Sequence, residues 1–303
     1  MATSLAWAAC SITGIAQEAT FKSSVDLVPI SALVRDGRGR AITTLQAADF
    51  EVRDNGVVRP ILGFEVDDHA PVTIAILVDT SGSMSVGSKI TTAREVVKWL
   101  SADLVDGRDE VGLFTFDGAL HQQHPFTQHP PAVNESFSDV APFGITSLYD
   151  AIAETARRLE ARPARRRAIV VLTDGVDTGS TLSPSEVSAR ASAIDAPVYV
   201  VATVPAIDHA NYVDRASAPN ARSTADARDL ALWTGGDLLW ATRVEDAAVR
   251  AGQILAEIRQ QYSIVIEAAS IDEWRPLEVR VRDRHLVVRA RAGYFARDSR
   301  LQR

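Results

Sequence analysis

The sequence predicts an α/β protein with a doubly wound, mostly parallel sheet, joined to a small β domain built from the two flanks of the chain. Two continuous apolar runs, residues 74–78 and 168–172, are typical of strands buried on both faces of a parallel sheet. Between residues 72 and 260 such runs alternate with segments of helical periodicity. The flanks alternate apolar and polar residues, as half-buried strands do.

The α/β region can be divided into elements in chain order. Apolar and β-branched runs predict strands at residues 74–78, 110–116, 168–173, 197–204 and 237–241, with an edge strand at 120–126. Helical periodicity predicts helices at residues 90–102, 148–159, 183–194, 225–233 and 244–260. Ser183 with Glu186 three residues later is a capping box, which marks where one of these helices begins.

Both flanks predict β structure. The N-terminal flank has a strand at residues 25–34, a short helical turn and a strand before the hairpin Asn55-Gly56, and a return strand at 57–66. The C-terminal flank has strands at residues 262–266, 277–281 and 286–290. Because each flank is too small to fold alone, we expect the two to pack together. The predicted domains are residues 21–67, 68–260 and 261–297, with 261–297 packing on 21–67.

Composition limits the classes of function. The net charge of -7 gives no indication of the basic surface that a nucleic-acid-binding protein needs. The single cysteine, Cys10, allows neither an intramolecular disulfide nor a cysteine-based zinc site. The densest basic run, residues 165–167, precedes a strand, and we expect it to be solvated.

The N-terminus suggests export. Residues 5–16 are short and apolar and end in small residues, as in a secretory signal, although a basic start is missing. Residues 1–20 are therefore predicted to be a signal peptide, the alternative being a frayed N-terminus. No apolar run reaches about 20 residues, so no permanent transmembrane helix is expected. The predicted location is secreted, periplasmic or in the cell envelope.

Oxygen-bearing side chains follow both central apolar runs. The first run ends in Asp79, Ser81 and Ser83, and the second ends at Asp174. Thr146 lies just ahead of a predicted helix. The carboxyl ends of parallel strands are where open α/β sheets bind ligands, so these side chains are expected to converge. Carboxylate and hydroxyl oxygens suit Mg²⁺ or Mn²⁺.

These three loops together resemble the metal-ion-dependent adhesion site of von Willebrand factor type A domains. The whole arrangement resembles a bacterial family of exported proteins with such a domain. The segments that carry the second resemblance are residues 45–56, the Asp79 motif, Thr173-Asp174-Gly175, Thr234-Gly235-Gly236, residues 258–262 and residues 291–295. The resemblance implies that Asp79, Ser81, Ser83, Thr146 and Asp174 bind the metal, and that the protein is an extracytoplasmic binding module. An Asp or Glu carboxylate of a protein partner would complete the metal's coordination shell.

Partner contacts are predicted beside this site. Asp177 lies just beyond Asp174, although ordinary turn chemistry explains it equally well. Residues 205–224 form a long polar insert after a strand's carboxyl end, and His209 and Tyr212 within it are candidate partner-binding residues. The alternative for this insert is disorder.

An enzyme is not predicted. Ser81 stands where an aspartyl phosphatase carries its second Asp, so that proton donor is missing. The chain has neither a G-x-x-x-x-G-K-[ST] phosphate loop nor a G-x-S-x-G nucleophile motif. The sequence favours a metal-dependent adhesion or scaffold module. The alternatives are a metal-dependent hydrolase and a domain with a purely structural role.

Overall fold

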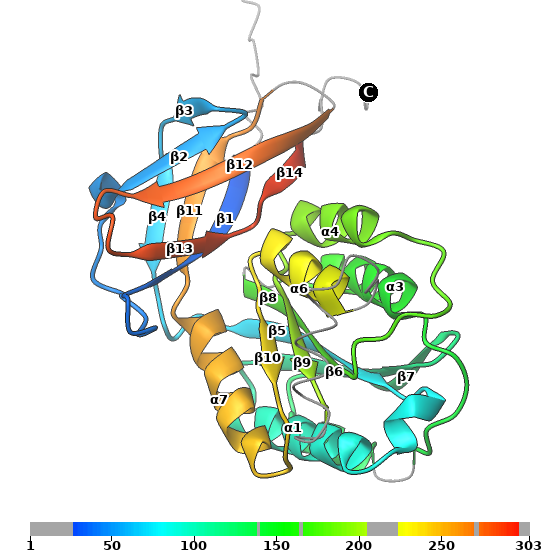
Figure 1. The fold of residues 1–303 in the computed structure, drawn as a ribbon. Coiled ribbons are helices and arrows are strands. Elements are labelled where there is room, and N and C mark those ends of the chain that lie inside the picture. Colours follow the sequence, from blue (N-terminus) through cyan, green and yellow to red (C-terminus); the bar gives the residue numbers. More distant parts are fainter. Residues whose placement is uncertain (1–26, 138–139, 164–165, 205–223, 270–272, 297–303) are drawn as a thin grey trace, which may run out of the picture.

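The computed structural model describes residues 27–137, 140–163, 166–204, 224–269 and 273–296. It has two parts: a central sheet covered by helices on both faces, and a smaller sandwich of two sheets (Figure 1). The α/β elements, in chain order, are β5 (Val72–Asp79), the 3₁₀ turn η2 (Gly82–Ser85), α1 (Lys89–Asp103), β6 (Glu110–Phe116), β7 (Leu120–Thr127), α2 (Pro131–Glu135), α3 (Leu148–Glu160), β8 (Arg166–Thr173), α4 (Pro184–Ala193), β9 (Val198–Ala202), α6 (Thr224–Trp233), β10 (Leu238–Trp240) and α7 (Asp246–Arg259).

The central sheet has the strand order β10-β9-β8-β5-β6-β7. All neighbouring pairs are parallel except β6 with β7, which is antiparallel and forms the edge. Every residue of β5 is buried, as its unbroken apolar run predicts for a central strand. The chain leaves β5 toward β6 on one side and later returns to β8 on the other. The carboxyl ends of β5 and β8 therefore meet at the topological switch point of the sheet.

Helices cover both faces of this sheet. One apolar core joins α1, α2 and α7 to one face, and a second joins α3, α4 and α6 to the other (Figure 1). α4 begins with the predicted capping box, since Ser183 accepts from the amide of Glu186 while the Glu186 carboxylate accepts from the amide of Ser183. Among the described residues, every helix is too short or too polar to cross a bilayer.

The sandwich mixes the two flanks of the chain. One sheet has the order β13-β1-β11-β4 and the other β14-β12-β2-β3. A core that contains Ile30, Val52, Tyr262 and Ile264 lies between them. The predicted fold class is thus confirmed, including the antiparallel sheets from the flanks. The strands, with the 3₁₀ turn that precedes β2, are β1 (Leu27–Arg35), η1 (Ala47–Asp49), β2 (Phe50–Asp54), β3 (Val57–Arg59), β4 (Gly63–Val66), β11 (Tyr262–Glu267), β12 (Glu273–Val281), β13 (Val287–Ala290) and β14 (Gly293–Ala296).

The return strand predicted at residues 57–66 is wrong in one respect. It divides into β3, which pairs with β2, and β4, which pairs with β11 in the other sheet. Pro60 has no amide hydrogen to donate to a ladder, and the chain changes sheets just after it. The amide of Leu62 already bonds to the carbonyl of Val265 in the second sheet, at 2.8 Å.

The sandwich contacts the central sheet at the amino ends of its parallel strands. Arg166, at the start of β8, was expected to be solvated. It is instead buried at this junction. Its guanidinium donates to the carbonyls of Ile258, Arg259 and Gln261, at the end of α7 and the start of β11. The last carbonyls of a helix have no partner within the helix, so a buried arginine is well suited to satisfy them.

A second set of ion pairs at this junction centres on Glu257 of α7. Its side chain is only 3% exposed and accepts from two arginines of the sandwich, Arg35 of β1 and Arg289 of β13. Arg289 also pairs with Asp237, just before β10. One carboxylate therefore ties both flanks of the chain to the α/β part.

We predict that Glu257→Ala lowers the free energy of unfolding by about 3 kcal/mol, because it leaves Arg35 without its carboxylate and Arg289 with Asp237 alone. The matched control is Glu278→Ala, which removes the exposed partner of Arg280 and should change stability by no more than about 0.5 kcal/mol. Urea unfolding followed by circular dichroism measures both. Equal losses in the two variants would contradict the role assigned to Glu257.

Candidate metal centre

Asp79 is the last residue of β5, and its side chain is fully buried. One carboxylate oxygen, Oδ1, accepts from the amide of Ser81 at 2.8 Å. The other, Oδ2, accepts from the hydroxyl of Thr173, the last residue of β8, at 2.6 Å. The carboxylate is therefore fixed to its own loop and to the neighbouring strand.

The two serines of the motif lie together after Asp79. Their hydroxyl oxygens are 3.1 Å apart, with Ser81 buried and Ser83 exposed. The chain turns here into η2, and the amide of Gly82 donates to the carbonyl of Gly144 at 3.1 Å. The pair of hydroxyls thus lies between a buried carboxylate and the solvent.

The loop that carries Thr146 is bonded to both other loops. The amide of Phe143 donates to the carbonyl of Thr80 at 2.7 Å, which attaches it to the first loop. The carbonyl of Thr146 accepts from the amides of Thr178 and Gly179, each at 2.9 Å, which attaches it to the third loop. Backbone bonds therefore hold the three predicted metal loops together.

Asp174 follows β8 directly and is 1% exposed. Its Oδ2 accepts from the ammonium group of Lys89 at 2.8 Å. Its Oδ1 is buried and has no hydrogen-bond partner among the described residues. A buried carboxylate oxygen without a donor or a cation is costly, so this atom is an observation that a bound cation would explain.

The raised pKa of Asp79 also favours a bound cation at this site. Burial raises the pKa of Asp79 to about 6, from an ordinary value of 3.8. Hydrogen bonds from Thr173 and Ser81 lower this pKa and the nearby charge of Asp174 raises it, so desolvation is the dominant cause. The ionised form of Asp79 would be stabilised by a positive charge placed beside it.

Of the three predicted partner-binding residues, Asp177 lies in the described part of the chain, where it bonds to the start of α3. The carboxylate of Asp177 accepts from the amide of Leu148, the first residue of α3, at 2.8 Å, and from the hydroxyl of Ser180 at 2.6 Å. These bonds satisfy the start of α3, which is the turn chemistry offered as the alternative. Its contact with a partner stays a prediction. His209 and Tyr212 lie outside the described residues.

Two residues beside the site were missed from the sequence. Asp117 follows β6 as Asp174 follows β8, and this position was a signal in the sequence. The ideal Cβ of Gly144, in the loop before Thr146, would lie 3.6 Å from the Cβ of Asp117. Lys89 is the first residue of α1, where the helix dipole disfavours a positive charge. A lysine at this position was the one feature of the sequence that could have drawn attention to it.

Metal ligands here would be mainly hydroxyls. Within the described ranges, no group of three or more His, Cys, Asp or Glu side chains could hold an ion. A hydroxyl-rich set with two carboxylates fits Mg²⁺ or Mn²⁺ and does not fit a histidine- or cysteine-dependent zinc site.

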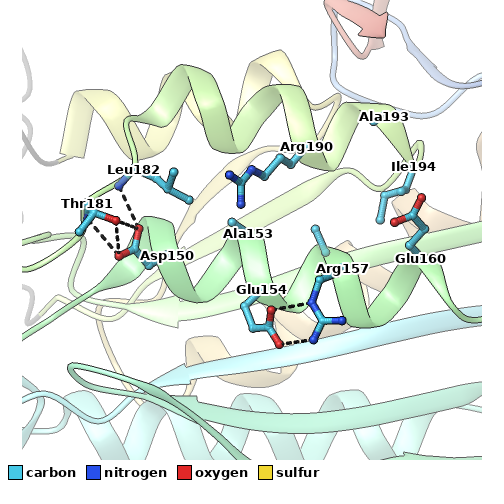
Figure 2. A pocket seen from close by; sticks show the side chains of 11 residues that line it. Asp150, Ala153, Glu154, Arg157, Glu160, Thr181, Leu182, Arg190, Ala193 and Ile194 are labelled. Atoms are coloured by element: carbon cyan, nitrogen blue, oxygen red, sulfur yellow. Dashed lines mark hydrogen bonds and ion pairs between the residues drawn. The ribbon is translucent and has the colours of Figure 1, made fainter. Parts of the chain in front are cut away.

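A separate groove lies between α3 and α4 and is lined by both charged and apolar residues (Figure 2). Glu154 pairs there with Arg157, and the carboxylate of Asp150 accepts from the amides of Thr181 and Leu182. These carboxylates are satisfied by their neighbours, unlike that of Asp174.

The comparisons with known proteins agree with the fold. Residues 74–176 match the model of the von Willebrand factor type A domain. No curated protein matches the chain. A von Willebrand factor type A structure from Catenulispora acidiphila has a TM-score of 0.52 and 13% identity over 78% of this chain and 74% of its own. An aerotolerance-related membrane protein from Bacteroides fragilis NCTC 9343 has a TM-score of 0.50 and 20% identity over 62% of this chain and 99% of its own.

A mutant of the PilB minor pilin from Streptococcus sanguinis has a TM-score of 0.48 and 16% identity over 66% of this chain. The chain covers 63% of that pilin's length, which is less than two thirds.

We predict that Asp79→Asn stabilises the metal-free protein above about pH 6. The folded pKa of about 6 exceeds the ordinary 3.8, so the folded state binds more protons than the unfolded state between these values. Wild-type stability should therefore fall as the pH rises from about 4 to about 6, and the variant should lack this slope. At pH 7.5 the variant should be more stable by roughly 1–3 kcal/mol. Urea unfolding in EDTA at several pH values tests this, and parallel pH profiles would contradict it.

Proposed function

We propose that the protein binds Mg²⁺ or Mn²⁺ at the carboxyl edge of the sheet and uses the ion to capture an acidic side chain of a protein partner. The match of residues 74–176 to the von Willebrand factor type A domain supports this proposal. Domains of this family are typically protein-interaction modules. The ion would accept the partner's carboxylate as a ligand.

The unpartnered, buried Oδ1 of Asp174 is the observation that carries this proposal. It lies one residue from Thr173, whose hydroxyl bonds to the carboxylate of Asp79. The charge of Asp174 is close enough to raise the pKa of Asp79, and both carboxylates are buried. The ammonium group of Lys89 pairs with Asp174. A divalent cation would supply the missing positive charge.

The proposed ligands are Asp79, Ser81, Ser83, Thr146 and Asp174. Only two of them are charged, so a bound ion would keep much of its positive charge for an incoming carboxylate. Octahedral Mg²⁺ also retains water readily, and such a water is a position that a partner can replace.

The surroundings of the site support a protein partner. Phe143, in the loop attached to Thr80, is 81% exposed, and Ile145 beside Thr146 is 57% exposed. Ile145 lies over Gly118 and Gly179, since an added Cβ on either glycine would contact its side chain. Apolar side chains that are held in this way beside a polar site are typical of protein-binding surfaces.

We also propose that the protein acts outside the cytoplasm, in the cell envelope or secreted. The apolar, small-residue segment at residues 5–16 supports this, because it resembles a secretory signal. Its described helices contain no membrane span.

The central prediction concerns metal binding. Asp79→Ala should abolish Mg²⁺ and Mn²⁺ binding, because it removes a charge and an oxygen donor. Ser81→Ala should weaken binding by roughly tenfold, since one neutral ligand is lost. Ser85→Ala is the matched control: Ser85 is exposed in the same turn and its hydroxyl donates to the carbonyl of Gly82, so metal affinity should be unchanged. Isothermal titration calorimetry measures all four proteins. Equal affinity in wild type and Asp79→Ala would refute the site.

The hydrolase alternative makes a different prediction. Both oxygens of Asp79 accept hydrogen bonds, from Ser81 and Thr173, and Oδ2 of Asp174 accepts from Lys89. The remaining oxygen, Oδ1 of Asp174, is the atom proposed to bind the ion, so neither carboxylate would act as a free general base in the loaded site. We therefore expect no turnover of generic ester or phosphate substrates with Mn²⁺ above that of Asp79→Ala. Metal-dependent turnover that is lost in this variant would establish the enzyme instead.

A further inference from the structure

Lys89 places a fixed positive charge inside the candidate metal centre. Its side chain is 10% exposed, and its ammonium group donates to Oδ2 of Asp174 at 2.8 Å and to the carbonyl of Ser83 at 3.2 Å. The residue begins α1, which packs on the sheet beside Met84 of η2. The ammonium is therefore attached to two of the three loops that would surround the ion.

The charges of the site lead to a consequence for metal affinity. Asp79 and Asp174 contribute two negative charges and Lys89 one positive charge, so the empty site carries one net negative charge when both carboxylates are ionised. A divalent ion would bring the loaded site to one net positive charge. Without Lys89 the loaded site would be neutral. Like charges a few ångströms apart repel strongly where burial lowers the effective dielectric constant.

Lys89 cannot be a ligand, because an ammonium group has no lone pair. It acts on the ion through its charge and through Asp174. Its bond to Oδ2 leaves Oδ1 of the same carboxylate as the atom without a partner.

We propose that Lys89 is a built-in cation that weakens the site's affinity for the divalent ion and couples ion binding to the arrival of a carboxylate. This inference rests on the proposed function and deepens it. The carboxylate neutralises the excess positive charge of the loaded site, so it tightens the binding of the ion. By thermodynamic reciprocity the ion tightens the binding of the carboxylate by the same factor.

The test uses Mn²⁺ as the metal and acetate as the carboxylate, on the full chain. Calorimetric Mn²⁺ titrations are made without acetate and with acetate at rising concentration, with chloride exchanged to keep the ionic strength constant. Lys89→Met removes the charge from a side chain of similar length. Lys98→Met is the matched control, because Lys98 lies on the same helix but is exposed and pairs with Glu95.

Without acetate, Lys89→Met should bind Mn²⁺ about tenfold more tightly than wild type or more, because the repulsive charge is gone. Acetate should tighten Mn²⁺ binding in wild type and in Lys98→Met by a larger factor than in Lys89→Met. Equal or weaker Mn²⁺ affinity in Lys89→Met would overturn the inference, and so would an equal effect of acetate on all three proteins.

A second variant, Lys89→Gln, keeps the test decisive if Lys89→Met fails to fold. Lys89→Gln keeps an N–H donor for Asp174 without the charge, and the same tightening of Mn²⁺ binding is expected. If wild type binds Mn²⁺, Asp79→Ala does not, and both Lys89 variants match wild type, then the coupling is wrong and the proposed function stands. If wild type binds no Mn²⁺, both are wrong.

Discussion

A hydrogen bond between the hydroxyl of Thr173 and the carboxylate of Asp79 joins the carboxyl ends of the two central strands. It forms at the topological switch point, where the chain connections on the two sides of β5 diverge. Both strands are almost entirely buried, and the sheet itself therefore fixes the positions of these two side chains. The metal loops depend on this pair: the first begins at Asp79, and the third begins at Asp174, the residue after Thr173.

The two parts of the molecule meet at the other edge of the sheet. Glu257 and Asp237 pair there with arginines of the sandwich, and Arg166 donates to the carbonyl of Gln261, the residue before β11. An eight-residue strand is roughly 26 Å long, so the sandwich and the candidate metal centre lie on opposite sides of the α/β part. The sandwich thus contacts the α/β part away from the candidate metal centre (Figure 1).

Much of this arrangement could be predicted because apolar periodicity reports burial directly. The buried run before Asp79, the capping box at Ser183 and the hairpin at Asn55-Gly56 all depend on local sequence, and all are present. The features that were missed depend on distant partners. Arg166 is buried because its guanidinium donates to the backbone carbonyls at and just after the end of α7. β4 separates from β3 because it forms backbone hydrogen bonds with β11 in the other sheet. Lys89 and Asp174 are 85 residues apart, and nothing local to either residue indicates that they meet.

The central claim, that three loops form a single site for a divalent cation, is tested most directly by anomalous diffraction from crystals grown with Mn²⁺. The account predicts one strong anomalous peak at the carboxyl edge of the sheet, within bonding distance of the hydroxyl oxygens of Ser81 and Ser83 and bordered by Asp79, Thr146 and Asp174. An absent peak at saturating Mn²⁺, or a peak held by other residues while these five side chains keep their metal-free contacts, would contradict it.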